Sequence, residues 1–250
     1  MNSTNRLQLL MDTTQKVATF VLSKFQGKKV DVSIKGDGSC VTNIDIEAES
    51  MAKELLLSQF PEDGFLGEEH DEHYGVSEYR WVVDPIDGTT SFIRGVPLFG
   101  TQIGLEYQGE PIAGNIVMPA MKESIWAPTG SDPSGPDPRG SGTGSIENAL
   151  ICTTSIDYYK QTNSLYVFDA LMQSGASIRG WSDCYAYMLL CTGRIDAVVE
   201  PLLHPWDIVP WIPIFKETGI KYSPIAEGYL ASNQKLHDSL YDVLNANITN

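Results

Sequence analysis

Basic residues are scarce in this sequence. It carries 17 Lys and Arg against 32 Asp and Glu, which gives a formal net charge of −15. Such a balance repels a phosphate backbone and offers no basic stripe, so no nucleic-acid partner is expected. The same surplus of carboxylates would repel a small phosphorylated substrate unless bound cations reverse the local charge. The charge balance therefore directs attention to metal ions.

Long apolar runs and a leader pattern are also missing. No stretch approaches the roughly 20 consecutive apolar residues of a membrane span, and the start, MNSTNRLQLLMDTTQ, lacks the basic-then-apolar order of a signal peptide. We therefore expect a cytoplasmic protein without a membrane partner. The four cysteines show neither the CxxC spacing of zinc and redox sites nor the density of a disulfide-stapled domain, which predicts buried free thiols.

Periodic segments predict an α+β arrangement in the first part of the chain. Helical spacing predicts helices over residues 6–25 and 44–60, and an irregular segment at 35–43 lies between them. A buried strand, YRWVVDP, follows. Three more β segments, TQIGLEYQ, PIAGNIVMP and ESIWAP, then suggest an antiparallel meander.

A stretch rich in Gly, Pro, Ser and Asp, TGSDPSGPDPRGSGTGS at 129–145, is the candidate boundary. We interpret it as a flexible loop between an N-terminal α+β half at 1–128, which holds most of the candidate ligands, and a C-terminal α/β half at 146–250. The halves are expected to form a single compact catalytic unit. The elements predicted in the second half are a strand ALICTTS, a helix at about 165–174, a helix from about 183, a strand RIDAVVEP and a helix after Trp206.

Five acidic residues stand out because each is predicted at the edge of an element, beside Gly, Pro or Thr. They are Asp45, Glu68, Asp84, Asp87 and Asp207. The DPIDGTT spacing places Asp84 and Asp87 on either side of a tight turn, where both carboxylates and the Ile86 carbonyl can point to one spot. Two carboxylates about 4 Å apart repel by roughly 4 kcal/mol at an effective dielectric near 20, so such a cluster requires divalent cations, and oxygen-only ligation suits magnesium. Taken singly, each residue is more often a solvated turn or a helix cap.

Three motifs in a fixed order connect these residues to a known family. GEE at 67–69, WVVDPIDGTTSF at 81–92 and WD at 206–207 occur together with KGDGSCVTNID and a C-terminal ASN. On these motifs the chain resembles the inositol monophosphatase superfamily over nearly its whole length. The resemblance implies an α+β fold, a layered α-β-α-β-α sandwich of the inositol monophosphatase and fructose-1,6-bisphosphatase type, and a homodimer. It also implies a phosphoric monoester hydrolase with two or three Mg²⁺ ions.

The resemblance assigns a role to each matching position. The residues that would hold the magnesium ions are Glu68, Asp84, Ile86 through its carbonyl, Asp87 and Asp207. Glu68 would share in catalysis with Asp45 and Thr89, which would orient the attacking water. The backbone amides of Gly88 and Thr89 would receive the phosphate if they open a helix.

Two further residues are expected to support the metal ligands without being ligands themselves. Glu69 would lie behind Glu68, and Lys35 would approach the metal site from a mobile loop. The implied reaction is metal-assisted in-line hydrolysis without a covalent phosphoenzyme.

The substrate depends on a separate set of segments. SFIRGVPLFGTQIGLEYQGEPIAG at 91–114, CTTS at 152–155 and SDCYAYMLLCTGRIDAVVEP at 182–201 look like the histidinol-phosphate phosphatase branch. Histidinol carries an ammonium and an imidazole, so its pocket needs acceptors such as Asp183 and Glu200, although Asp183 could also cap the following helix. We therefore predict hydrolysis of histidinol phosphate in histidine biosynthesis. The alternatives are an inositol monophosphatase or broad sugar-phosphate phosphatase, and a catalytically silent binding protein.

Two local features carry expectations of their own. The HDEH segment at 70–73 is expected to be a solvated acidic loop, because a hard-cation site prefers oxygen ligands. Pro213 is expected to bend the helix that follows Asp207, since proline removes a backbone donor.

Overall fold

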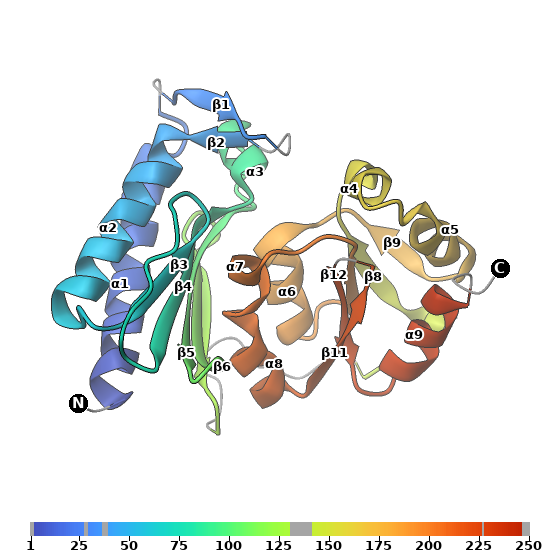
Figure 1. The fold of residues 1–250 in the computed structure, drawn as a ribbon. Helices are drawn as coiled ribbons and strands as arrows, with labels where there is room; N and C mark the ends of the chain where they lie inside the picture. Colours follow the sequence, from blue (N-terminus) through green and yellow to red (C-terminus); the bar gives the residue numbers. More distant parts are fainter. Residues whose placement is uncertain (1–2, 28–29, 37–39, 131–141, 227, 247–250) are drawn as a thin grey trace. The chain divides into compact units, whose positions relative to one another are not determined.

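The computed structural model describes residues 3–27, 30–36, 40–130, 142–226 and 228–246 (Figure 1). These residues group into two units, Met1–Gly135 with Pro205–Ile214, and Pro136–His204 with Phe215–Asn250. The short segment 205–214 is thus grouped with the N-terminal elements, whereas the sequence places it in the C-terminal half. Of the predicted loop at 129–145, residues 131–141 lie outside the described residues. Across the described ranges, none of the helices is both long enough and apolar enough to cross a membrane.

The first unit is built on a five-stranded sheet. Its elements are α1 (Ser3–Lys24), β1 (Val32–Ile34), β2 (Cys40–Thr42), α2 (Asn43–Gln59), β3 (Gly64–Gly67), β4 (Tyr79–Asp87), α3 (Thr89–Ile93), β5 (Gly100–Tyr107), β6 (Glu110–Met118), β7 (Glu123–Pro128) and α7 (Pro205–Ile208). The sheet order is β3-β4-β5-β6-β7, in which β3 and β4 are parallel and the other neighbours are antiparallel. The predicted meander is therefore confirmed. Helices α1 and α2 lie side by side against this sheet (Figure 1).

The segment predicted to be irregular at 35–43 contains a strand. Cys40–Thr42 forms β2 and pairs antiparallel with β1, so the prediction was wrong for these residues. The Gly-rich and polar composition of the segment did not indicate this strand, because strand pairing depends on a partner strand as well as on local residues. Residues 37–39, between the two strands, lie outside the described residues.

Alternation along β5 and β6 decides what each face of the first sheet contacts. Ile103 and Leu105 belong to the apolar cluster that also contains residues of α1 and α2. Gly104 lies between them in the strand, so a side chain at this position would be on the opposite face of the sheet. An added Cβ at Gly104 would lie 3.2 Å from the Pro210 backbone. Its cross-strand partner Gly114 would bring a Cβ to 1.7 Å from the Pro210 carbonyl oxygen. These two glycines therefore let the chain after α7 pack directly on this face of the sheet.

The helix predicted after Trp206 is divided in two. α7 ends at Ile208 and α8 (Trp211–Thr218) begins three residues later, so Pro210 lies in the break. Pro213 falls in the first turn of α8, where a backbone N–H would have no intrahelical partner. The prediction that Pro213 bends the helix was therefore wrong, and the interruption lies at Pro210 instead.

The second unit contains a mixed five-stranded sheet with the order β11-β12-β10-β8-β9. Its elements are a 3₁₀ turn (Ile146–Asn148), β8 (Leu150–Thr153), α4 (Ile156–Gln161), α5 (Leu165–Gln173), β9 (Ser177–Arg179), α6 (Asp183–Cys191), β10 (Ala197–Glu200), the second half of α8 from Phe215, β11 (Ile220–Ile225), β12 (Gly228–Asn233) and α9 (His237–Asn245). β8 is parallel to β9 and β10, while β12 is antiparallel to β10 and β11. Leucines of α5 and α9 belong to the apolar cluster of this unit. All four cysteines are free thiols, three of them buried, and Cys40 is only partly covered.

His237, at the start of α9, is a buried histidine of the second unit. Its Nε2 lies 2.8 Å from Ser223 Oγ and its Nδ1 lies 2.9 Å from Ser232 Oγ. Burial lowers the pKa of His237. At this histidine the unfolded chain therefore binds protons more readily than the folded chain, so we expect the contribution of His237 to stability to decrease as the pH falls below the ordinary histidine pKa of about 6.5.

We expect the free energy of unfolding of His237→Gln to decrease less than that of the wild type between about pH 7.5 and pH 5.5. Urea denaturation at both pH values measures this difference. The exposed His204→Gln is the matched control and should retain the wild-type pH dependence. Equal pH dependence in His237→Gln and wild type would contradict the assignment.

Candidate active site

The candidate site begins where β4 leaves its regular register. Asp84 pairs with Gln102, and the next pairing joins Asp87 to Gly100, so β4 contains a bulge of one extra residue. Gln102 lies on the same face as Gly104, two residues further along β5, and its Nε2 donates to Asp87 Oδ2 at 3.0 Å. The bulge thus brings Asp84 and Asp87 to the face of the sheet that packs against the chain after α7.

Asp84 is the centre of a group of acidic side chains. It is 2% exposed, and its Oδ1 accepts a hydrogen bond from the Ile86 amide at 2.9 Å. Burial raises the pKa of Asp84 well above its ordinary value, and neighbouring negative charges raise it further. Those charges belong to Glu68, Asp87, Asp207 and Asp45. The five acidic residues selected from the sequence are therefore neighbours in the first unit.

The donor chemistry of this group fits magnesium. Among the described residues, no three His, Cys, Asp or Glu side chains are arranged as a ready set of metal ligands. The group nevertheless consists of carboxylate oxygens, which hard divalent cations prefer, and the repulsion between them favours a cation. The assignment of individual ligands remains a prediction.

Lys35 makes two ion pairs with the glutamates that follow β3. Its Nζ lies 2.6 Å from Glu68 Oε1 and 2.9 Å from Glu69 Oε1. Burial lowers the pKa of Lys35, but its hydrogen bonds and the charges of both glutamates outweigh this effect and raise the pKa overall. Burial and the charge of Glu68 raise the pKa of Glu69 to about 7. Lys35 thus supplies positive charge to the edge of the acidic group.

Asp45 and Thr89, the predicted water-orienting pair, contact each other. Asp45 lies in the first turn of α2, and its Oδ2 accepts hydrogen bonds from the amide, at 2.9 Å, and the hydroxyl of Thr42. Thr89 Oγ1 lies 3.1 Å from Asp45 Oδ1 and 3.0 Å from the Ile86 carbonyl oxygen. Burial raises the pKa of Asp45, although hydrogen bonds from Thr42 and Thr89 oppose the increase.

The turn after β4 also provides the predicted helix start. Gly88 has φ 90°, in the left-handed region that favours glycine, and it is the N-cap of α3. α3 begins at Thr89. Gly88 and Thr89 therefore open a helix, which is the arrangement that the predicted binding of phosphate by their amides requires.

Gln102 and Trp211 are two site residues whose roles the sequence did not predict. Trp211 Nε1 donates to Gln102 Oε1 at 2.8 Å, and Gln102 in turn donates to Asp87. Both side chains are fully buried. A glutamine within an apolar strand pattern was the available signal, because a buried amide needs hydrogen-bond partners.

The predicted substrate residues belong to the second unit. Glu200 ends β10, is 4% exposed and accepts a hydrogen bond from the Tyr187 hydroxyl at 2.9 Å. Asp183 begins α6 with φ 59°, a conformation that costs a non-glycine residue about 1–3 kcal/mol. Its Oδ2 accepts a hydrogen bond from Ser182 Oγ at 3.0 Å, and burial raises its pKa. The N-cap of α6 is Ser182, without a side-chain cap, so the alternative role of Asp183 as a cap was wrong.

The mixed α/β fold and the oxygen-donor group at a strand end are typical of metal-dependent phosphoryl-transfer enzymes. The model of the inositol monophosphatase family matches residues 3–248. The chain therefore belongs to the inositol monophosphatase family, and it is a phosphatase, a phosphoric monoester hydrolase.

Individual relatives agree with this membership. A histidinol-phosphatase from Chlorobaculum parvum is 36% identical over 215 residues, 85% of this chain and 83% of the relative. An inositol-1-monophosphatase from Caulobacter vibrioides is 30% identical over 256 residues, 95% of this chain and 100% of the relative. The crystal structure of the extragenic suppressor protein suhB from Bartonella henselae matches with a TM-score of 0.89 at 27% identity, covering 97% of this chain and 99% of that one. The predicted family and fold class are confirmed.

Proposed function

We propose that this protein is a magnesium-dependent phosphatase that hydrolyses histidinol phosphate to histidinol and phosphate in histidine biosynthesis. The observation that carries the metal dependence is the buried Asp84 with four acidic neighbours, and enzymes of this family are generally magnesium-dependent. The choice of substrate is supported by 36% identity to a histidinol-phosphatase and by the acidic residues Asp183 and Glu200 in the second unit. A cytoplasmic location and a homodimer stay predictions.

We assign metal binding, orientation of the attacking water and phosphate binding to different residues of the first unit. Bound Mg²⁺, two or three ions, would activate a water molecule and neutralise charge on the phosphoryl oxygens and the leaving alkoxide. A Thr89 hydroxyl that donates to Asp45 keeps lone pairs that can accept a hydrogen bond from the attacking water. The amides of Gly88 and Thr89 would hold the phosphate. The residues proposed to hold the ions are Glu68, Asp84, Ile86 through its carbonyl, Asp87 and Asp207.

Asp183 and Glu200 would select the substrate. Both are carboxylates, and histidinol presents an ammonium group and an imidazole as hydrogen-bond donors. Tyr187 fixes one oxygen of Glu200, which keeps that side chain ordered before substrate binds. An inositol ring presents only neutral hydroxyl groups and would gain less from two carboxylates.

The nearest alternative is an inositol-1-phosphate or broad sugar-phosphate phosphatase. The relative from Caulobacter vibrioides favours it, since the match extends over that protein's full length. The two functions share the same metal chemistry and differ in the groups that contact the alcohol.

Phosphate release from histidinol phosphate and from inositol 1-phosphate, measured with Mg²⁺, tests the proposal. We expect a higher kcat/KM for histidinol phosphate. Asp183→Asn should lower that value by roughly 10- to 100-fold, because a hydrogen bond to a charged group contributes about 1.5–3 kcal/mol. The change with inositol 1-phosphate should be smaller.

The matched control is Asp157→Asn, an exposed carboxylate of the same unit that pairs with Lys160. This variant should keep the wild-type preference. A strong wild-type preference for inositol 1-phosphate would reject histidinol phosphate as the substrate and leave the magnesium-dependent reaction in place.

A further inference from the structure

Glu49, on α2, is a fully buried carboxylate that binds the segment following β3. Its Oε2 accepts a hydrogen bond from the Glu69 amide at 2.7 Å. Its Oε1 accepts two more, from the His70 amide at 3.0 Å and from His70 Nδ1 at 2.8 Å. A carboxylate removed from water needs such partners, so this segment and α2 are held in one arrangement.

Gly67, which precedes Glu68 in the chain, allows the close approach of the Glu49 carboxylate. An added Cβ at Gly67 would lie 2.3 Å from the Glu49 carboxyl carbon, closer than any real Cβ contact. Glu68 therefore lies between two residues that contact the Glu49 carboxylate: Gly67 packs against it, and the Glu69 amide donates a hydrogen bond to it. The backbone on both sides of Glu68 is fixed by one side chain.

We propose that Glu49 is a positioning residue that sets the place of the Glu68 carboxylate and, through it, the affinity for Mg²⁺. This inference rests on the proposed metal role of Glu68. The physical reason is that a ligand on an irregular segment contributes fully only when its backbone is already ordered, because ordering it on binding costs conformational entropy. Residues that orient metal ligands in this way typically change metal affinity by about 10–100-fold.

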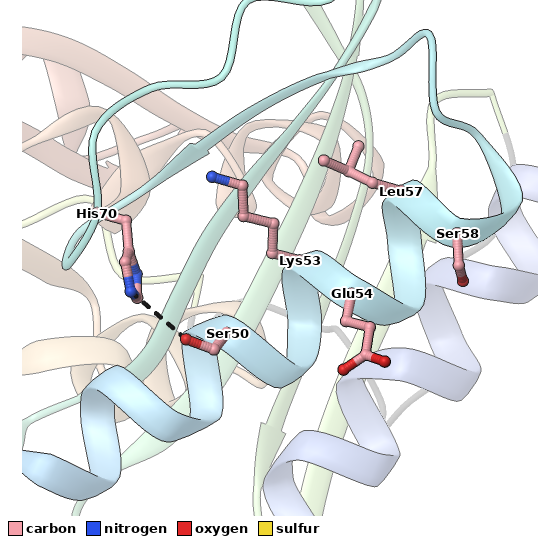
Figure 2. Close-up of a pocket in the computed structure, with 6 residues that line it drawn as sticks. All are labelled: Ser50, Lys53, Glu54, Leu57, Ser58 and His70. Carbon is pink, nitrogen blue, oxygen red and sulfur yellow. Dashed lines mark hydrogen bonds between the residues drawn. The ribbon is translucent and has the colours of Figure 1, made fainter.

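His70 is the partly exposed member of the group of residues that contact Glu49. Its side chain is 35% exposed. Its Nε2 lies 3.4 Å from Ser50 Oγ, and Figure 2 marks this contact with a dashed line. The loop predicted to be solvated at 70–73 is thus partly exposed at His70, where the ring also contacts Glu49. The histidine borders a pocket of about 460 Å³ whose other lining residues are Ser50, Lys53, Glu54, Leu57 and Ser58. Exposed Glu54, on the same helix and in the same pocket, offers a matched control.

Glu49→Gln tests the proposal with little change in volume. The amide would present an NH₂ group to one of the N–H donors, so at least one of the three contacts must break. Calorimetric titration should show Mg²⁺ affinity reduced by about 10–100-fold, and phosphatase activity should recover toward the wild-type rate at saturating Mg²⁺. Amide hydrogen exchange at Glu69 and His70 should become faster without Mg²⁺. Glu54→Gln should match the wild type in every measurement.

Gly67→Ala is the second variant, because its Cβ would displace the Glu49 carboxylate while every polar group is retained. It should reduce Mg²⁺ affinity in the same direction. A folded Glu49→Gln protein with Mg²⁺ affinity within about twofold of the wild type would overturn the role of Glu49 alone. Wild-type protein that binds no Mg²⁺ would overturn the proposed function and this inference with it.

Discussion

Asp84→Asn is expected to lower magnesium-dependent phosphate release by roughly 10³-fold or more. A metal ion contributes several kcal/mol to stabilising charge in such a reaction, and each 1.36 kcal/mol corresponds to a tenfold change in rate. Asp84 is the carboxylate on which the charges of four other acidic residues converge. Replacing it with an amide removes the central charge of the proposed magnesium site.

The same variant should be at least as stable as the wild type when no divalent cation is present. Burial and four negative neighbours raise the pKa of Asp84, so its ionised form is disfavoured in the folded state, and its ionisation reduces stability as pH rises above the unfolded carboxyl pKa. Asparagine keeps an oxygen that can accept the Ile86 amide hydrogen bond. Thermal unfolding with a chelator present should therefore show an equal or higher Tm.

The combination of lost activity and retained stability separates a functional role from a structural one. Asp71→Asn, an exposed carboxylate of the first unit, is the matched control and should change neither property. An Asp84→Asn protein that retains full magnesium-dependent activity would remove this residue from the proposed ligand set. A strongly destabilised protein would show that the Asp84 charge has a compensating partner.

Regular elements with a clear period could be predicted from the sequence. ESIWAP corresponds to β7 at Glu123–Pro128, and the predicted helix at 44–60 corresponds to α2 at Asn43–Gln59. Strand alternation and helical spacing are local signals, and tertiary packing reinforces them here. β2 was missed because its three residues become a strand only by pairing with β1.

The acidic residues of the site could be selected because each is predicted at the edge of an element and because the motifs that contain them occur in the order of a known family. Asp84 ends an apolar strand pattern, and a carboxylate in such a place needs a partner. The residues that hold these acidic side chains or their backbone in place could not be predicted, because their roles depend on contacts between parts of the chain that are distant in sequence. Trp211 reaches Gln102 across 109 positions of sequence, and Glu49 reaches Glu69 across 20. Neither pairing follows from residue type or local spacing.

The grouping of the short segment 205–214 with the first unit could not be predicted from the sequence either. Asp207 could be selected from the WD motif, yet no change of composition marks the segment as part of the first unit. Its place depends on Gly104 and Gly114, whose missing side chains make room for Pro210. A glycine in a strand suggests a close approach by another part of the chain, without identifying which part.

Arg6→Met is expected to destabilise the first unit by about 3–5 kcal/mol, because it leaves a buried carboxylate without its charged partner. Arg6 Nε and Nη2 each donate to a different oxygen of Asp63 at 2.8 Å, and Asp63 is fully buried. The guanidinium also lies 4.0 Å and 3.9 Å from the ring centroids of Phe60 and Tyr79. These contacts join α1 to the loop after α2 and to β4.

Chemical denaturation of wild type, Arg6→Met and Arg6→Lys measures the effect. Lysine keeps the positive charge but loses the two-point geometry and the stacking, so its cost should be intermediate. Lys160→Met, which breaks the exposed pair with Asp157, is the control and should cost less than about 1 kcal/mol. Equal stability of Arg6→Met and wild type would mean that the hydrogen bonds from Ser77 and Trp81 suffice to hold the Asp63 charge. Because α1 and the acidic group share one unit, the loss of stability should also lower the temperature at which phosphatase activity is lost.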